Sequence, residues 1–438
     1  MAALKVIGGA GFIGRHVVAA LIQAGHQVEA PAQTDFDIAA GDPGVMAARL
    51  VGAEVVVNCA GLARDARHES LAGVNAEGAR RLALACRQAG VKRLVHISAL
   101  GAGKDDKTRF QRSKGEGEEA IRGVEGLETV IVRPSMALGA GGASGDFFSA
   151  LAALPVPPRL GSGDWKVQPL HVSELAELIV RLAFAPDPPA SVEAVGPAPI
   201  TTDELTRELR EWLGLPAAPP LALPRALLNL FAWANEIVEM GPGDRELLDL
   251  LERGSVADPA SITAALGRRP LSFAESLARQ PASIGDLWRA RLYFVQPLFR
   301  VTLAALWFGT GLVSFGLYPP DEFYVMLGEL GLTGPLAEVW LFGVAAINIV
   351  LGGLMLVNWR PIRVAQAMFA LLVVFSLAAL TLPHEYWLTP FAPILKNAPI
   401  AAALLAFMGM EKPSPRKAKQ PFARVAAATH PARTASAS

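Results

Sequence analysis

A glycine-rich run near the start of the sequence has the residue types and spacing of a phosphate-binding turn. The run reads GGAGFIG from Gly8, follows an apolar strand-like segment and opens a helical pattern. In that context Gly8 permits a tight turn, Gly11 lets the backbone approach a pyrophosphate, and Gly14 lets helix and strand pack closely. The free N–H groups at the helix start, around Phe12 and Ile13, favour phosphates. We predict dinucleotide binding; a tight strand–helix turn without a ligand is the alternative.

The segments that would position this turn alternate between short apolar runs and helical patterns over residues 1–215. The expected strands are 5–8, 27–30, 54–58, 94–98 and 129–133, and the expected helices include 16–24, 76–88 and 113–122. Short strands rich in Val, Ile and Leu that alternate with helices are typical of a parallel sheet covered on both faces. We therefore predict an α/β fold, a Rossmann-type doubly wound parallel sheet, for residues 1–215.

Residues 216–292 have weaker helical periods and are predicted to complete a small substrate-side lobe and to form a membrane-proximal connector. Just before them, Thr201-x-x-Glu204 is a capping-box pattern that predicts a helix start, with a chance match as the alternative. Six apolar residues share one helix face: Leu227, Leu230, Phe231, Ala234, Ile237 and Val238. We predict that this face packs on a core; a membrane surface or a ligand pocket are the alternatives.

From residue 293 the sequence has the composition of a membrane domain. Four candidate spans, at 298–317, 338–357, 364–382 and 391–410, each approach the roughly 20 apolar residues that a hydrocarbon core requires. The fourth is interrupted by Pro393 and Pro399, so it is tilted, broken or partly interfacial. We predict an all-α four-helix transmembrane domain over residues 293–411 and a disordered basic tail over residues 412–438.

The distribution of basic residues predicts the orientation of these spans. Arg289 and Arg291 precede the first span, Arg360 and Arg363 lie between the second and third, and the basic tail follows the fourth. The loops between, 318–338 and 383–390, contain no Lys or Arg. Because cytoplasmic loops carry the excess of Lys and Arg, the N-terminal domain and the C-terminus are both predicted to be cytoplasmic.

Composition argues against several other classes of protein. The 40 Lys and Arg residues balance the 40 Asp and Glu residues, so no basic nucleic-acid surface is expected. The 7 histidines are scattered without metal-ligand spacing, and no metal site is predicted. Two cysteines, Cys59 and Cys86, cannot build a disulfide framework, and we interpret them as reduced core thiols.

Polar residues inside the expected spans are costly where they face lipid. They are Arg300, Asn348, Gln366, Lys396 and Asn397. We expect them to turn inward or to snorkel, mainly as helix-to-helix contacts, with a quinone or ion site as the alternative. Two glycine pairs are expected to allow close helix approach: Gly309 with Gly311, and Gly352 with Gly353.

A set of short motifs gives the N-terminal part a resemblance to a known family. Besides GGAGFIG, the motifs are Asp37-Ile38, Asn58-Cys59-Ala60-Gly61, Val74-Asn75 with Gly78, the segment ISALGA from Ile97, Lys114 four residues after Phe110, and Arg133-Pro134-Ser135. Together they resemble the extended and atypical short-chain dehydrogenase/reductases over residues 3–280. Within that family, the sequence is most similar to the branch that includes the nucleotide-binding accessory subunit of respiratory complex I.

The C-terminal part resembles a second family. Residues 293–411, with their FVQPLFR run from Phe294 and their PILKNAP run from Pro393, are similar to the DoxX-like membrane domain. A fusion of the two resembles a bacterial membrane-tethered reductase-like protein. The resemblance therefore implies a multi-pass protein of the bacterial inner membrane.

The resemblance also implies an NAD or NADP site and assigns residues to it. Asp37-Ile38 would lie at the adenine ring, and Ala60-Gly61 would face the cofactor. Lys114 would bond the nicotinamide ribose, and Pro134-Ser135 would flank the nicotinamide. The alternatives are a solvated loop acid for Asp37 and a surface helix lysine for Lys114. The choice between NAD and NADP is not readable, although Arg15 is within reach of a 2′-phosphate if it is not simply an exposed helix residue.

The sequence departs from the family at the active site. The family's enzymes use Tyr-x-x-x-Lys, in which the tyrosine exchanges a proton, and here the tyrosine position holds Phe110. Ala99 and Leu100 also stand where a catalytic Ser or Thr is expected. Ser98 and Lys114 remain as candidate catalytic residues, alongside a bound water or the substrate itself. The alternative for Ser98 is a strand-end hydroxyl bonded to backbone.

Two functions from different classes remain open. The first is an NAD(P)-dependent oxidoreductase that acts on a lipophilic substrate such as a quinone or an isoprenoid. The second is a non-catalytic NAD(P)-binding subunit that stabilises a membrane complex or senses its redox state, and Phe110 favours it. A sugar-nucleotide epimerase-like activity is a third, weaker hypothesis.

Overall fold

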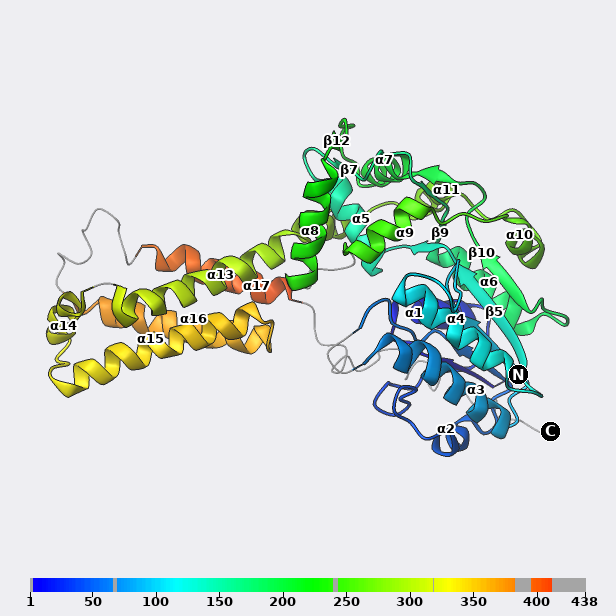
Figure 1. Ribbon diagram of the computed structural model, residues 1–438, viewed down its shortest axis with the longest axis horizontal. Coiled ribbons are helices and arrows are strands. Elements are labelled where there is room, and N and C mark those ends of the chain that lie inside the picture. The colour runs from blue at the N-terminus through cyan, green and yellow to red at the C-terminus, as the bar shows by residue number, and fades with distance from the viewer. Residues whose placement is uncertain (1–2, 66–68, 239–242, 318, 383–394, 412–438) are drawn as a thin grey trace, which may run out of the picture. The chain divides into compact units, whose positions relative to one another are not determined.

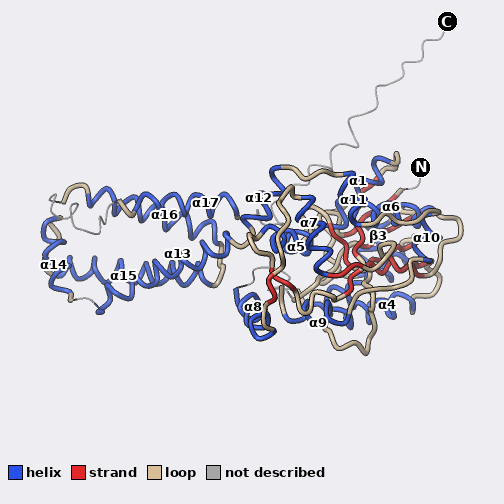
Figure 2. Tube along the Cα trace, turned by 90° about the horizontal axis from the view of Figure 1, so that it is seen from above, coloured by secondary structure: helices blue, strands red, loops and turns tan. Residues whose placement is uncertain are grey.

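The computed structural model describes residues 3–65, 69–238, 243–317, 319–382 and 395–411. The chain divides into two compact units. The first contains most of the chain up to Ala290, and the second contains Ala234–Met240 and most of the chain from Arg291. Figure 2 shows that the strands belong to the first unit and that the second is built from helices.

The first unit, in which Figure 1 labels β5 and β10, is organised around one parallel sheet. Its six strands have the order β10-β5-β4-β3-β1-β2. The strands are β1 (Leu4–Ile7), β2 (Val28–Glu29), β3 (Val55–Asn58), β4 (Arg93–Ile97), β5 (Glu128–Pro134) and β10 (Ser191–Ala194). Every pair of neighbours is parallel, which confirms the predicted sheet. Sequence patterns did not predict β10, because a strand of four residues at the edge of a sheet is too short to show a recognisable pattern of apolar residues.

Helices cover both faces of the sheet, as the continuous apolar strands require. On one face Val57 and Val95 pack with α1 (Phe12–Gln23), α6 (Val172–Phe184) and α10 (Ala260–Leu266). On the other face Val56 and Leu94 pack with α2 (Pro43–Leu50) and α3 (Ala79–Gln88). Adjacent strand residues thus belong to opposite cores. The π-helical segment η1 (Ala72–Gly78) leads into α3, and α4 (Arg109–Arg122) packs beside it.

A smaller lobe is built from segments that come after β5 in the chain, on both sides of β10. Its strands form three two-stranded pairs: β6 (Met136–Leu138) with β9 (Pro169–His171), β7 (Pro158–Arg159) with β12 (Leu221–Ala222), and β8 (Lys166–Val167) with β11 (Ile200–Thr201). Its helices are α5 (Ala143–Ala153), α7 (Thr202–Trp212), α8 (Arg225–Val238), α9 (Arg245–Arg253), α11 (Phe273–Arg279) and α12 (Ile284–Leu292). The predicted capping box is confirmed at α7, where Thr201 and Glu204 bond each other's backbone.

The predicted core face of α8 is wrong. Leu227, Leu230 and Phe231 are exposed, and the helix instead buries Leu228 and Ala232. The side chains of Ile237 and Val238 lie outside the described part of the structure. Leu228 and Ala232 form a second apolar side of α8 next to the predicted one, so the helical period alone did not distinguish the packed side from the free one.

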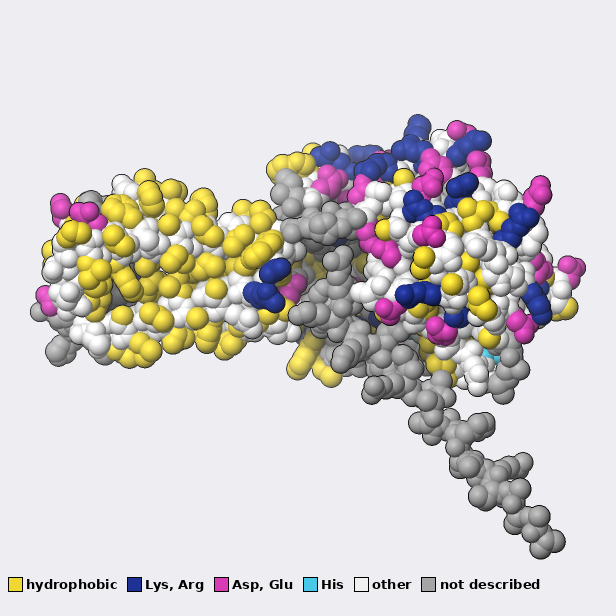
Figure 3. All heavy atoms as spheres, turned by 90° about the horizontal axis from the view of Figure 1, so that it is seen from below, with side chains coloured by type: hydrophobic (Ala, Val, Ile, Leu, Met, Phe, Trp, Pro, Cys, Tyr) yellow, Lys and Arg dark blue, Asp and Glu magenta, His cyan; other side chains and the backbone are white. Residues whose placement is uncertain are grey.

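The second unit is a bundle of apolar helices. They are α13 (Val295–Leu312), continued by the π-helical η2 (Val313–Leu317), α14 (Pro320–Glu329), α15 (Pro335–Leu356), α16 (Pro361–Ala379) and α17 (Asn397–Met410). On the face shown in Figure 3, hydrophobic side chains cover most of this bundle. Among the described residues, three helical segments are long and apolar enough to cross a membrane: 284–317, 335–356 and 361–379. They confirm three of the four predicted spans as apolar helices.

The fourth predicted span differs. Its first residues, 391–394, lie outside the described part, as do the loop 383–390 and the tail 412–438. The described helix, α17, has 14 residues. At about 1.5 Å per residue it measures roughly 21 Å, which is shorter than a hydrocarbon core of about 30 Å. The acidic loop after the first span also contains a helix, α14, that was not predicted.

The intramembrane polar residues follow the expectation in part. Arg300 and Asn348 are buried in the bundle, and Asn348 Nδ2 donates to the Val344 carbonyl at 3.1 Å. Asn397 Nδ2 donates to Ser376 Oγ at 2.8 Å, which joins α17 to α16 as a helix-to-helix contact. Gln366 and Lys396 are exposed on the helix surfaces instead.

One glycine of each predicted pair makes a close helix contact. A Cβ at Gly311 would lie 2.6 Å from the Ala345 carbonyl oxygen, and one at Gly352 would lie 2.6 Å from the Phe308 nitrogen. At Gly309 and Gly353 a Cβ would meet nothing within 4 Å. The close contact between α13 and α15 therefore requires a residue without a side chain at Gly311 and at Gly352.

This difference predicts the effect of valine at neighbouring positions. Gly352→Val should destabilise the bundle by about 1–3 kcal/mol, because overpacking forces the helices apart. Gly353→Val is the matched control and should have little effect. Unfolding of the full chain by sodium dodecyl sulfate, followed by circular dichroism, measures both. Equal losses in the two variants would contradict the close α13–α15 contact.

Candidate functional site

The backbone of the glycine turn between β1 and α1 packs directly against neighbouring backbone atoms. Gly8 has φ +75°, and a Cβ there would lie 2.6 Å from the Ala60 nitrogen. A Cβ at Gly14 would clash with the Gly8 carbonyl oxygen. Residues with side chains are therefore excluded at both positions. The turn presses α1 against the end of β3, which is the role predicted for Gly8 and Gly14.

Gly11 has a different environment, because it is exposed and its backbone is ordinary at φ −70° and ψ 172°. It is the N-cap of α1, and among the described residues no side chain caps this helix start or places an acid in its first turn. The first N–H groups of a helix lack intrahelical partners, and the helix dipole adds partial positive charge there. Phe12 and Ile13 lie at this start. The turn therefore fits a pyrophosphate.

The segment after β2 places Asp37 and Ile38 in a tight turn. Asp37 Oδ1 accepts hydrogen bonds from the N–H of Ala39 at 2.8 Å and of Ala40 at 3.3 Å. The Ile38 side chain is buried, and its carbonyl oxygen would lie 3.1 Å from a Cβ at Gly78. Asp37 is thus a half-buried turn residue whose carboxylate already has backbone partners, rather than a freely solvated acid.

Arg15 is not directed toward the segment after β2. Its Nη2 donates to the Ala140 carbonyl at 2.7 Å, and its guanidinium lies 5.5 Å from the centre of the Phe12 ring. These contacts hold the side chain against the loop after β6. The structure gives no support to a 2′-phosphate role for Arg15.

Buried polar side chains join the ends of β3 and β4. Asn58 Oδ1 accepts from the Ala60 N–H at 3.1 Å, so its Nδ2 faces His96 Nδ1 at 3.0 Å. His96 is fully buried, and burial together with the charge of Lys114 lowers the pKa of its imidazole to about 3. The ring is therefore neutral at pH 7 and accepts at Nδ1. Its bond to Asn58 fixes the backbone that leads into Ala60-Gly61.

Asn75, at the centre of η1, connects the loop after β3 to helix α4. Its Oδ1 accepts from the Leu62 N–H at 2.9 Å, and its Nδ2 donates to the Leu62 carbonyl at 2.8 Å and to Ser113 Oγ at 3.0 Å. The same amide therefore holds Gly61 beside α4. A Cβ at Gly61 would lie 2.7 Å from Lys114 Nζ. We call this arrangement the Asn75 clamp.

Lys114 is buried rather than at the surface, with an exposed fraction of 5%. Its Nζ donates to the Ile97 carbonyl at 3.0 Å. Burial lowers the pKa of its ammonium to about 8, although the nearby Cys59 and Glu118 partly oppose the shift. The surface alternative is therefore wrong. At pH 7–8 both protonation states of Lys114 are accessible, as proton exchange requires.

Ser98 follows β4 at the same edge of the sheet. It is 4% exposed, and within the described part of the chain its Oγ has no hydrogen-bond partner. The alternative of a hydroxyl bonded to backbone is therefore wrong. A buried hydroxyl without a partner costs free energy, so a ligand that accepts a hydrogen bond from Ser98 would recover part of that cost.

A cavity of about 580 Å³ opens at this end of the sheet, and Ala99, which follows Ser98, lines it, whereas Ser98 and Lys114 do not. Phe110, at the tyrosine position one helical turn before Lys114, lines it, and so do Ser135 and Leu100. Helix α9 supplies an apolar wall consisting of Leu247, Leu250 and Leu251. Ser135 Oγ donates to the Gln168 carbonyl, and Pro134 ends β5 just before it.

Glu246 of α9 was not among the residues predicted for the site. It lines the cavity, and its Oε1 accepts from the Phe110 N–H at 3.1 Å. The sequence signal was the strongly amphipathic run RELLDLLER, which begins after the N-cap Asp244. That pattern predicts a helix but not its partner, which lies 136 residues away along the chain.

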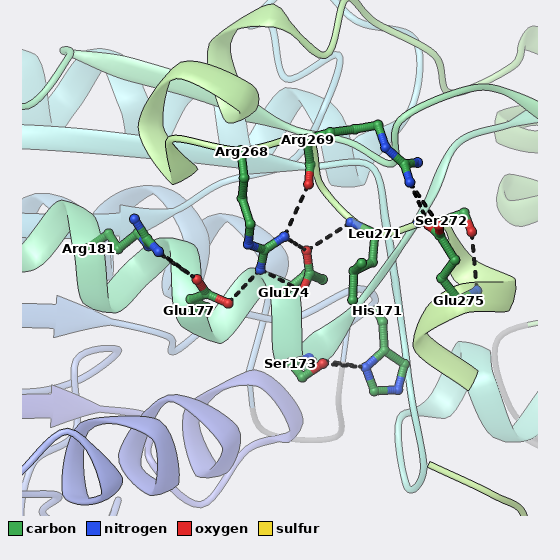
Figure 4. A network of polar contacts seen from close by, with 10 residues as sticks. All are labelled: His171, Ser173, Glu174, Glu177, Arg181, Arg268, Arg269, Leu271, Ser272 and Glu275. Atoms are coloured by element: carbon green, nitrogen blue, oxygen red, sulfur yellow. Dashed lines mark hydrogen bonds and ion pairs between the residues drawn. The ribbon is translucent and has the colours of Figure 1, made fainter. Parts of the chain in front are cut away.

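His171 has a structural role near this region (Figure 4). Its Nδ1 lies 2.7 Å from Ser173 Oγ at the start of α6, and burial lowers the pKa of its imidazole to about 4. Beside it, Arg268 binds Glu174 at 2.8 Å and Glu177 at 2.6 Å. These contacts hold the segment before α11 against α6.

Comparison with known families identifies both parts of the chain. Residues 4–195 match the NAD dependent epimerase/dehydratase family, and residues 304–405 match the DoxX-like family. The chain therefore contains an epimerase-type short-chain dehydrogenase/reductase domain and a DoxX-like domain, which confirms both predicted resemblances. The DoxX-like match and the three long apolar helices indicate membrane association.

Curated relatives cover the first of these domains. A "Ceramide reductase" of Caulobacter vibrioides is 33% identical over 197 residues, which are 42% of this chain and 61% of that protein. The "NADH dehydrogenase [ubiquinone] 1 alpha subcomplex subunit 9, mitochondrial" of Arabidopsis thaliana is 30% identical over 254 residues, 50% of this chain and 62% of that one. The chain thus spans about three fifths of the length of the curated relatives it matches.

Solved structures share the fold of the first unit. Human epimerase family protein SDR39U1 with NADPH superposes with a TM-score of 0.51 and 22% identity, covering 64% of this chain and 99% of that one. MoeE5 in complex with UDP-glucose and NAD gives a TM-score of 0.50 and 22% identity, covering 66% of this chain and 98% of that one. At this identity the likeness concerns the fold.

Proposed function

We propose that this chain is a membrane-anchored oxidoreductase that binds NAD or NADP in its epimerase/dehydratase-type domain and reduces a lipophilic substrate, with a quinone as the first class to test. The observation that carries the proposal is the cavity at the end of the sheet, with its apolar wall from α9. Its lining residues Ala99 and Phe110 belong to the segments that carry the buried Ser98 and Lys114. The solved neighbours that contain NAD or NADPH support the choice of cofactor.

The residues of the glycine turn are suited to hold the nucleotide. Gly8, Gly11 and Gly14 leave the backbone open to a diphosphate, and the start of α1 at Phe12-Ile13 offers N–H groups to it. Asp37-Ile38 would bound the adenine pocket, and Ala60-Gly61, held by the Asn75 clamp, would form the floor under the cofactor. Pro134-Ser135 would bound the nicotinamide end.

The bound nucleotide supplies a hydride, and the chain supplies the proton that must accompany it. Reduction of a quinone to a hydroquinone consumes one hydride and one proton. Ser98 Oγ is proposed to donate this proton. Lys114, which makes no direct hydrogen bond to Ser98, is proposed to orient the ribose and to restore the proton through a bound water. Phe110 and the α9 wall would exclude water and bind the apolar ring.

The proposed location is the bacterial inner membrane, with the nucleotide-binding domain on the cytoplasmic side. The distribution of Arg289, Arg291, Arg360 and Arg363 supports this orientation. A hydride carrier bound at the surface of a bilayer would have direct access to substrates dissolved in it.

Turnover by the full chain tests the proposal. The protein purified in detergent should oxidise NADH or NADPH in the presence of a short-chain quinone, and absorbance at 340 nm follows the reaction. Ser98→Ala should lower kcat by about 100-fold or more, since general acid catalysis contributes on that scale. Absence of turnover with both nucleotides would dismiss the oxidoreductase.

A matched control separates chemistry from packing in the Ser98 experiment. Ser276 in α11 is also buried, and its hydroxyl also lacks a partner within the described part of the chain. Ser98→Ala and Ser276→Ala remove the same kind of group, so both should leave stability nearly unchanged. If Ser276→Ala lowers kcat as strongly as Ser98→Ala does, the proton role of Ser98 is wrong.

A second candidate function is a non-catalytic NAD(P)-binding subunit that stabilises a membrane complex or senses its redox state. The observation that favours it is Phe110, which has no transferable proton at the position where the family's enzymes use tyrosine. The similarity to a complex I subunit also supports it. Mass spectrometry of proteins that co-purify with the full chain tests this function, which predicts a stoichiometric membrane partner.

A further inference from the structure

Helix α8 presents an apolar face that the described part of the structure does not cover. Leu227, Leu230 and Phe231 are exposed by 41%, 55% and 57%. They are spaced at i, i+3 and i+4, so they form one stripe along the helix, and the half-buried Ala234 continues it. The opposite side holds polar Asn229 and Glu236. We call the stripe of Leu227, Leu230 and Phe231 the α8 apolar face.

The α8 apolar face lies in a part of the chain that is tied to the membrane helices. The first part of α8, through Trp233, belongs to the first unit, and the residues from Ala234 to the helix end belong to the same compact unit as the spans. The division between the two units therefore falls within one helix. Trp233, exposed between the stripe and Asn229 on the helix surface, is the residue type that favours the bilayer interface.

A second helix at the boundary has the same character. In α12, Ile284, Trp288 and Leu292 recur every four residues and are all exposed. The apolar helical segment that starts at Ile284 is 34 residues long. At about 1.5 Å per residue it measures roughly 51 Å, against a hydrocarbon core of about 30 Å, so its first turns must lie outside that core.

We propose that the α8 apolar face lies in the interfacial layer of a phospholipid bilayer. Amphipathic helices bind there by burying an apolar stripe to a depth of about 5–10 Å. A second copy of the chain fits less well, since a stable interface needs about 800 Å² from each partner and the stripe consists of three large side chains. The docking is independent of any reaction and goes beyond the proposed oxidoreductase.

This docking would bring the cavity close to the lipid. Arg225 of α8 binds Glu252 of α9 at 2.6 Å, so the two helices are joined. The neighbouring residues of α9, Leu250 and Leu251, line the cavity. A bilayer that holds α8 therefore also holds the apolar wall of the cavity near the membrane surface.

Nitroxide labels on single introduced cysteines test the proposal in the full chain. The protein is reconstituted at one chain per nanodisc of phosphatidylcholine and phosphatidylglycerol. Leu230→Cys and Phe231→Cys carry the label on the stripe, and Asn229→Cys carries it on the opposite side of the same helix. All three positions are exposed, so the label leaves the fold intact.

The native cysteines do not interfere with this experiment. Burial raises the pKa of both thiols, at Cys59 and Cys86, to about 12. Because the thiolate is the reactive form, the buried Cys86 and the half-buried Cys59 should react much more slowly at pH 7 than an introduced exposed cysteine. Mass spectrometry of the labelled protein should show one label per chain.

The proposal makes a clear distinction between the labels. At positions 230 and 231, oxygen should relax the nitroxide more strongly than a water-soluble nickel chelate does, and at position 229 the order should reverse. Nickel accessibility at all three positions would overturn the proposal. The proposal would also be overturned if the labels at positions 230 and 231 were protected from nickel only when each disc held two chains. That result would assign the α8 apolar face to a contact with a second copy. A Leu227→Cys label that becomes accessible to nickel when Leu230 and Phe231 are both replaced by glutamate would support the bilayer.

Discussion

Replacement of Gly11 by valine is expected to weaken NAD(P)H binding by at least about tenfold, or about 1.4 kcal/mol, while the protein keeps its fold. A Cβ at Gly11 meets only the Gly8 carbonyl oxygen, at 3.1 Å, and the backbone there suits any residue. The valine side chain would instead fill the space through which a diphosphate approaches the start of α1. Quenching of protein fluorescence by NADH and NADPH measures the loss.

Gly44→Val is the matched control for Gly11→Val. Gly44 lies in the first turn of helix α2, close to a helix start like Gly11, and a Cβ there would also have its nearest neighbour at 3.1 Å, on Asp42 Oδ1. The control should bind both nucleotides normally. Unchanged binding in Gly11→Val, with the fold confirmed by circular dichroism, would refute the nucleotide site at the glycine turn. Gly14→Val is unsuitable, because its clash with Gly8 would perturb the fold itself.

The second large effect is expected from Phe110→Tyr, which should raise turnover with NAD(P)H and a quinone by about 100-fold. Phe110 and Lys114 are one helical turn apart and lie on the same face of α4. A phenol at position 110 would gain a proton-exchanging group beside the cavity, and the charge of Lys114 would lower its pKa. Because the pKa of Lys114 is about 8, the gain should shrink as the pH rises through 8 and the ammonium loses its proton.

Phe110→Leu controls for the loss of the phenyl ring in this experiment. It keeps an apolar side chain in the cavity but adds no hydroxyl, so it should not raise kcat. Turnover that is present in Phe110→Tyr and absent from the natural chain would favour the non-catalytic subunit. No gain in Phe110→Tyr would mean that residue 110 does not reach the reacting atoms.

Local patterns predicted the parts of the site that lie within short segments. The glycine spacing around Gly8 and Gly14 was sufficient because the contacts that require glycine join a strand, a turn and a helix next to one another in the chain. The parallel sheet followed from its apolar strands for the same reason. The position of Ser98 at the end of β4 was also predictable, since the strand and its end are read from one run of residues.

Contacts between distant segments were not predictable in this way. The burial of Lys114 depends on Gly61 and Asn75, and the bond from Phe110 to Glu246 joins helices far apart in the chain. The α8 apolar face shows a further limit. Apolar residues on two sides of one helix give no indication of which side a core covers, and only the packing of Leu228 and Ala232 decides it.

The Asn75 clamp has a consequence for how two ligands would affect each other. One amide holds the loop at Gly61 and, through Ser113, the helix that carries Phe110. Under the proposed function, the coenzyme would contact the loop at Gly61, and the substrate would contact the helix that carries Phe110. The coenzyme and the substrate would then contact the two segments that the Asn75 amide joins. Binding of either molecule should therefore change the affinity of the protein for the other by thermodynamic linkage.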